Sequence, residues 1–189
     1  MTRVRVMLIV VAGLLATSNQ ASAQWMDTRQ TMGFGPQFFG GASPIPRETV
    51  YYPFNYAPGT IVVDTAERRL YLVQGGGQAL RYGIGVGRDG FRWGGVHHVS
   101  AKKEWPEWTP PREMLARRPD LPRHMIGGIE NPLGARALYL GSTLYRIHGS
   151  NEPETIGQAV SSGCFRMTND DVVDLYNRVA VGALVIVKN

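Results

Sequence analysis

The chain has 189 residues, with 20 Lys and Arg against 15 Asp and Glu, a net charge of +5 and one cysteine. A single cysteine excludes an intrachain disulfide framework, and the basic residues form no run of the kind that binds nucleic acid. The length suffices for one domain with a sizeable hydrophobic core.

Residues 1–23 have the pattern of a secretory signal peptide. Arg3 and Arg5 form a basic start, an apolar run of eleven covers 6–16, and "ASA" at 21–23 offers a small-residue cleavage site. The apolar run is well short of the ~20 residues that span a bilayer, so no membrane span is expected after cleavage. The pattern therefore predicts an exported protein.

Residues 24–58 are rich in Gly, Pro and aromatic residues and sustain neither a helical nor a strand period. We interpret this stretch as an extended arm or linker that docks locally through its aromatic side chains. From residue 59 to residue 189 the pattern changes to short β-prone runs separated by turn residues. These runs are "TIVVD", "RRLYLVQ", "ALRYGIGVG", "GVHHVSA", "RALYL", "TLYRIHG" and "ALVIVKN".

One convincing helix is predicted among the strands, in "TNDDVVDLYNRVAVG". Thr168 can cap its N-terminus with Asp171 three residues on, and apolar residues recur at helical spacing after them. Gly182 is expected to end the helix before the last strand. Many strands with one packed helix indicate a mainly β fold, either a sandwich or an open barrel of mixed sheets.

Two motifs suggest cofactor or metal chemistry but lack the context it needs. "GVGRDG" (85–90) fits a dinucleotide-binding pattern, yet the residues after it predict turn and strand instead of the required helix N-terminus. His97 and His98 are neighbours on a predicted strand, so their side chains point to opposite faces and cannot readily share an ion. We expect neither a metal nor a cofactor.

The unpaired cysteine, Cys164, follows His148 by sixteen residues. An exported protein exposes a lone thiol to oxidation, and the neighbours of Cys164 make a poor apolar environment for a buried structural cysteine. The run "TLYRI" predicts a strand that ends at His148, and a loop from there could return the thiol to the imidazole. A histidine within hydrogen-bonding reach can hold a cysteine as the nucleophilic thiolate, and Gly163 would let backbone N–H groups face an oxyanion.

The stretch "IHGSNEPETIGQAVSSGCFRMTNDDVVDLY" (147–176) resembles the active-site signature of the L,D-transpeptidases of the YkuD type, which include the ErfK, YbiS, YcfS and YnhG proteins. In that signature a histidine-glycine pair and a loop precede serine-x-glycine-cysteine, an apolar residue, arginine and methionine. The resemblance extends upstream through "KKEWPEWTPPREM" and "NPLGARALYLG" and covers about residues 60–187. It implies a mixed β-sandwich with a helix beside the catalytic cysteine loop.

The resemblance implies peptidoglycan chemistry in the periplasm or cell wall, without a cofactor. Enzymes of this kind cleave a tetrapeptide stem before its terminal D-alanine, hold the acyl group on cysteine and pass it to an amine. The amine can belong to a second stem peptide, which gives a 3→3 cross-link, or to the N-terminus of an outer-membrane protein. Family members are also acylated by carbapenems.

The matching positions give each motif residue an expected role. Cys164 is the nucleophile and His148 the general base, the Gly149 carbonyl orients the imidazole, and N–H groups near Gly163 and Cys164 form the oxyanion hole. Ser162 stands where many members have a second histidine. This departure keeps the base but removes whatever substrate contact or thiolate tuning that imidazole provides.

Three further residues are candidates for substrate binding. Arg166 could hold a substrate carboxylate or instead form an ion pair with Asp170 or Asp171. Trp105 and Trp108 could line the substrate groove or simply pack under a loop.

Two alternative functions remain open from the sequence. The same acyl-enzyme could be resolved by water, as in a carboxypeptidase or a cross-link hydrolase, or the domain could bind the cell wall without catalysis.

Overall fold

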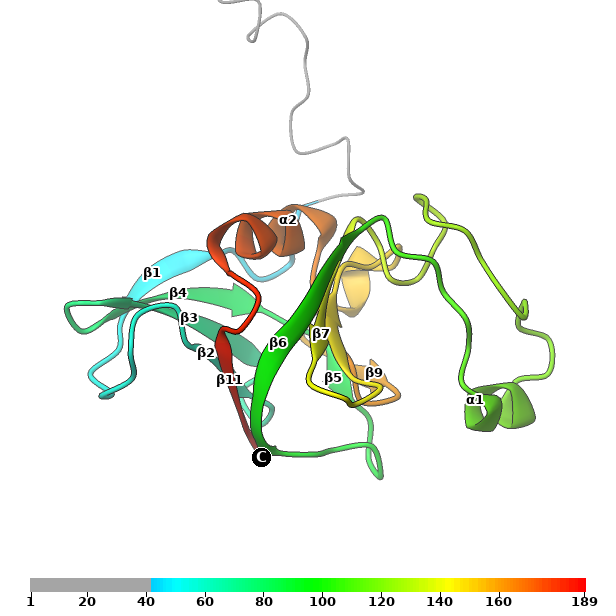
Figure 1. Ribbon diagram of the computed structural model, residues 1–189, viewed down its shortest axis with the longest axis horizontal. Coiled ribbons are helices and arrows are strands. Elements are labelled where there is room, and N and C mark those ends of the chain that lie inside the picture. The colour runs from blue at the N-terminus through cyan, green and yellow to red at the C-terminus, as the bar shows by residue number, and fades with distance from the viewer. Residues whose placement is uncertain (1–41) are drawn as a thin grey trace, which may run out of the picture. The chain divides into compact units, whose positions relative to one another are not determined.

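The computed structural model describes residues 42–189 (Figure 1). The predicted signal peptide and residues 24–41 of the predicted arm lie outside the described residues, so both stay predictions. The elements in chain order are β1 Glu48–Tyr51, β2 Ile61–Asp64, β3 Arg69–Gly75, β4 Gln78–Gly83, β5 Val86–Gly87, β6 Gly95–Glu104, α1 Arg112–Arg117, β7 Arg136–Leu140, β8 Arg146–His148, the 3₁₀ turn η2 Pro153–Thr155, β9 Ala159–Ser161, β10 Phe165–Arg166, α2 Asn169–Arg178 and β11 Leu184–Lys188.

Nine of the strands pair in the order β1-β4-β3-β2-β11-β6-β7-β8-β10, and β5 pairs with β9. Most pairs are antiparallel, but β2 with β11, β8 with β10 and β5 with β9 are parallel, so the sheet is mixed. The long strand β6 lies between β11 and β7 (Figure 1). It pairs with β11 in its first half and with β7 in its second half, and its register with β7 shifts between Val99 and Ala101. Such a bulge bends a strand, and β6 thereby joins two halves of the sheet.

The main hydrophobic core lies between these two halves and α2. Alternate residues of β2 and β3, such as Ile61 and Leu70, contribute from one half, and Leu138 and Ile147 contribute from the other. All four are 0% exposed. The predicted fold class, a mainly β mixed sandwich with a helix against it, is confirmed.

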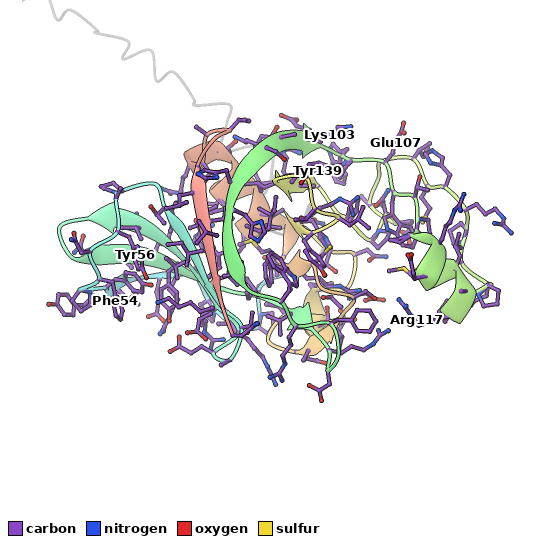
Figure 2. All side chains as sticks on the ribbon, turned by 60° about the horizontal axis from the view of Figure 1, so that its bottom comes forward. Phe54, Tyr56, Lys103, Glu107, Arg117 and Tyr139 are labelled. Atoms are coloured by element: carbon purple, nitrogen blue, oxygen red, sulfur yellow. The ribbon has the colours of Figure 1, made fainter. Side chains whose placement is uncertain are left out.

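Part of the predicted arm joins the sheet. β1 pairs antiparallel with β4 as an edge strand. After β1, the buried ring of Tyr52 stacks on Tyr71 of β3 with ring centroids 4.8 Å apart. Phe54 and Tyr56 continue this aromatic cluster beyond Tyr52 (Figure 2). Residues 48–56 thus contact the sheet through aromatic side chains and through strand pairing, which the irregular sequence of this segment did not predict.

The predicted helix is present as α2, with the predicted N-cap and an earlier end. The Thr168 side chain accepts a hydrogen bond from the Asp171 N–H. The helix ends at Arg178, where Lys102 of β6 donates to two carbonyls of its last turn, each at 2.6 Å. Gly182, which was expected to end the helix, instead forms the turn before β11 with φ of +93°. The short helix α1 was not predicted.

The two motifs weighed for cofactor and metal binding lie in strands and turns. "GVGRDG" contains β5 and a turn, and the next element is β6. His97 and His98 lie on β6, and His97 packs edge-on against Trp93. Within residues 42–189, no group of three or more metal-binding side chains is close enough to hold an ion. No helix in this part of the chain is long and apolar enough to cross a membrane.

Candidate active site

The parallel pairing of β8 and β10 brings together four side chains of the candidate site. In the register of the two strands, His148 lies opposite Arg166. Two residues earlier on each strand, Arg146 lies next to Cys164. Side chains alternate along a strand, so Arg146 and His148 share one face of β8, while Cys164 and Arg166 share the same face of β10. The residues between them, Ile147 and Phe165, are buried in the core. Arg146, His148, Cys164 and Arg166 are called the catalytic square below.

The imidazole of His148 is held in one tautomer. Its Nδ1 lies 2.6 Å from the Gly149 carbonyl oxygen, which can only accept a hydrogen bond, so Nδ1 carries the proton and Nε2 is left as the proton acceptor. A side chain on Gly149 would collide with Oδ1 of Asn169, the first residue of α2. That Oδ1 accepts a hydrogen bond from the Ala135 N–H at 2.8 Å, so it is not free to move away.

Burial keeps both members of the Cys164–His148 pair neutral. Desolvation, assisted by the charges of Arg166 and Arg146, lowers the pKa of His148 to about 3. Burial raises the pKa of the Cys164 thiol, although the positive charges of Arg146 and Arg166 act against this rise. The thiolate expected from the sequence is therefore not the favoured resting form, because the imidazolium that would accompany it is buried beside two cations.

The turn before the thiol is fixed by hydrogen bonds. The Ser161 hydroxyl accepts from the Gly163 N–H at 3.1 Å and donates to the Cys164 carbonyl at 2.6 Å. The Trp93 indole N–H donates to the Gly163 carbonyl at 2.6 Å. Gly163 has φ of +110° and is tightly packed against the Tyr145 ring, so only glycine fits.

These bonds bear on the expected oxyanion hole. The Gly163 N–H donates to the Ser161 hydroxyl, so it could donate to an oxyanion only if that bond were given up, and its expected role stays a prediction. The Cys164 N–H has no acceptor within residues 42–189. The Cys164 amide is therefore the available donor, and Ser162 lines the cleft next to it.

The catalytic square opens into a cleft of about 1030 Å³. The opposite wall is formed by the long connection between β6 and β7, which carries α1 away from the strands (Figure 1). Trp108 lines the cleft and is anchored by a mutual backbone pair with Met125. Trp105, expected at the same groove, is not among the lining residues, and its N–H donates to the Ala135 carbonyl.

The two arginines of the catalytic square have different surroundings. Arg166 donates to a Glu152 carboxylate oxygen at 2.8 Å, in the loop that connects β8 to β9. The alternative ion pair of Arg166 with Asp170 or Asp171 is not present among residues 42–189, where Asp171 pairs with Arg47 at 3.4 Å. Arg146 was not singled out from the sequence, although its place two residues before His148 on a predicted strand is a signal that it shares the histidine's face.

Comparison with known proteins identifies relatives of this chain. The family model "L,D-transpeptidase catalytic domain" (YkuD) matches residues 58–187. The probable L,D-transpeptidase ErfK/SrfK of Escherichia coli is 40% identical over 134 residues, which cover 66% of this chain and 42% of that protein. The probable L,D-transpeptidase YbiS of E. coli is 39% identical over 134 residues and 43% of its length. The matched segment therefore spans less than half of these relatives.

Solved structures share the fold. A Brucella melitensis protein, described as a probable carnitine operon oxidoreductase, is 46% identical with a TM-score of 0.53, over 75% of this chain and 92% of that one. An L,D-transpeptidase from Mycobacterium smegmatis has the same TM-score at 20% identity, over 70% of this chain and 59% of that one.

Proposed function

The chain belongs to the L,D-transpeptidase catalytic domain family, and we propose that it transfers acyl groups of peptidoglycan stem peptides through a cysteine acyl-enzyme. The observation that carries this proposal is the catalytic square, in which strand pairing brings a thiol and a base of fixed tautomer to one face of a cleft. The proposal also places the protein outside the cytoplasmic membrane, in agreement with the signal pattern of residues 1–23.

In the first step, the Cys164 Sγ attacks the carbonyl carbon that joins the third stem residue to the terminal D-alanine. Nε2 of His148 takes the thiol proton, and the carbonyl electrons move to the oxygen, where the Cys164 N–H donates a hydrogen bond. The carbon–nitrogen bond then breaks, the leaving amine takes the proton from Nε2, and D-alanine departs. A thioester remains on Cys164, and the imidazole is neutral again.

A resting state in which Cys164 and His148 are both neutral is compatible with this order of steps. Proton transfer from the Cys164 thiol to the His148 imidazole is uphill without substrate charge nearby, since the pKa of His148 is lowered and that of Cys164 is raised. Negative charge that develops on the substrate beside His148 stabilises the imidazolium by Coulomb attraction. Bond formation to the substrate therefore accompanies proton transfer, and no free thiolate has to accumulate.

In the second step, an amine of the acceptor attacks the thioester, His148 removes the excess proton of that amine, and the thiol is regenerated. A stem-peptide acceptor gives a 3→3 cross-link, and a protein acceptor gives an anchored protein. Ser162 cannot supply an imidazole at the cleft, so His148 is the base for both steps. Arg166 is proposed to hold the loop through Glu152 and so to set the width of the cleft beside His148.

The test uses the protein lacking residues 1–23 and a disaccharide tetrapeptide, with mass spectrometry of the products. We expect loss of D-alanine with formation of a cross-linked dimer, and neither product with Cys164→Ser or His148→Ala. A monomer that has lost D-alanine, with no dimer, would indicate transfer to water instead. A carbapenem provides a second readout: one equivalent should add to Cys164 in the unaltered protein. An intact tetrapeptide and no adduct in the folded protein would refute the enzymatic proposal.

A further inference from the structure

Arg146 is a cation at the cleft whose guanidinium has no carboxylate partner within residues 42–189. It lines the cleft, and its Nε is buried without a hydrogen-bond partner in this part of the chain. By contrast, Arg166 on the neighbouring strand is paired with Glu152. The positive charge of Arg146 thus has no carboxylate counterpart in this part of the chain, and a guanidinium at a cleft can bind an anion.

The position of the Arg146 guanidinium is supported from the next strand. Tyr139 of β7 is paired directly opposite Arg146 of β8, and the guanidinium carbon lies 5.2 Å from the centre of the tyrosine ring (Figure 2 labels Tyr139). A cation over an aromatic face is attracted to it and loses rotational freedom. The ring thus holds the guanidinium on the cleft face of the sheet, the face shared with His148.

Arg146 also stands next to the nucleophile. The register of β8 and β10 puts Arg146 next to Cys164 across the parallel pair of strands, and the positive charge of Arg146 acts to lower the pKa of the thiol. Both residues line the same cleft, so a carbonyl carbon under attack by Sγ lies on the side of the cleft that carries Arg146.

We propose that Arg146 binds the carboxylate of the residue that leaves, and so selects acyl donors that end directly after the scissile bond. The inference rests on the proposed function. In a tetrapeptide stem only the nitrogen and Cα of D-alanine separate the attacked carbon from the free carboxylate, a span of roughly 3.8 Å at most. A planar guanidinium can bind that carboxylate through two parallel hydrogen bonds.

Longer donors lack this contact. A stem with a fifth residue has a neutral amide where the tetrapeptide has its carboxylate, and its own carboxylate lies about 3.8 Å farther along the chain. A hydrogen bond to a charged group contributes roughly tenfold or more to binding. We therefore expect the free acid to be preferred over an otherwise identical terminal carboxamide by about tenfold or more.

The experiment compares the tetrapeptide stem as free acid and as terminal carboxamide, with release of D-alanine or D-alaninamide as the readout for kcat/KM. The unaltered protein should prefer the free acid, Arg146→Gln should bring the ratio of the two kcat/KM values close to one, and Arg146→Lys should fall between them. Arg117→Gln is the matched control, because Arg117 of α1 lines the same cleft against the Phe91 ring (Figure 2). That variant should keep the ratio of the unaltered protein.

The outcomes separate this inference from the proposed function. A ratio near one in the unaltered protein, or an unchanged ratio in a folded Arg146→Gln variant, would overturn the role of Arg146 and leave the enzyme intact. If Arg117→Gln lost the preference for the free acid as fully as Arg146→Gln, the role of Arg146 would also be overturned, because any positive charge in the cleft would then have the same effect. Release from neither substrate by the unaltered protein would overturn the proposed function, and the role of Arg146 with it. Iodoacetamide alkylation of Cys164 in each variant shows whether the thiol itself still reacts.

Discussion

Replacing Ser161 by alanine should loosen the turn that presents the nucleophile. The Ser161 side chain is 3% exposed, and its hydroxyl bonds to the Gly163 N–H and to the Cys164 carbonyl. Alanine removes both bonds and leaves two backbone groups short of a partner. At about 1–2 kcal/mol for each group, the free energy of unfolding should fall by roughly 2–4 kcal/mol. For a domain of this size the midpoint of thermal unfolding should fall by about 5–15 °C.

The neighbouring serine supplies the matched control. Ser162 is half-buried at the cleft, and no side-chain hydrogen bond is formed by it within residues 42–189. Thermal unfolding followed by circular dichroism, together with the rate of carbapenem addition to Cys164, should show large losses for Ser161→Ala and small ones for Ser162→Ala. Equal melting temperatures and equal acylation rates in the two variants would refute the claim that the Ser161 bonds hold the turn.

Three further outcomes follow from the same structure. The rate of Cys164 alkylation should rise with pH into the alkaline range, because the pKa of the Cys164 thiol is raised and that of His148 is lowered to about 3; a plateau between pH 5 and pH 7 would instead indicate a thiolate–imidazolium pair. Removing residues 1–57 should lower the melting temperature by several degrees, since β1 and the buried Tyr52 ring leave with them; an unchanged melting temperature would show that the arm is dispensable. Gly149→Ala should reduce acylation at least tenfold by displacing the carbonyl that orients His148; acylation at the unaltered rate in a folded variant would contradict this.

Local sequence patterns predicted the helix and strands that are determined by residues close to one another in the sequence. The capping residue Thr168 and the apolar spacing after it predicted α2, and β-prone runs between turn residues predicted most strands. β1 was missed because its pairing partner β4 lies about thirty residues away and its own four residues carry no alternation. The end of α2 was missed for a similar reason, since Lys102 reaches it from β6.

The candidate site was predictable in its residue types but not in its hydrogen bonds. His148, Gly149 and Cys164 were selected by motif, and the structure brings them together. The occupied Gly163 N–H could not be predicted, because it depends on the rotamer of Ser161 and on a positive φ angle. The importance of Arg146 depends on register, and a shift of one residue would turn its side chain to the other face.

The spacing of sixteen residues between His148 and Cys164 follows from the way their strands pair. Adjacent antiparallel strands can be joined by a two-residue turn, but adjacent parallel strands need a crossover of a dozen or more residues. β8 and β10 are parallel neighbours, so the chain must leave the sheet after His148 and return before Cys164. Residues of this crossover also contribute to the site. Glu152 forms an ion pair with Arg166, and the Ser161 hydroxyl donates a hydrogen bond to the Cys164 carbonyl and so fixes the turn before the thiol. The nucleophile and its base are thus held by one sheet, while the residues that adjust them belong to the loop between.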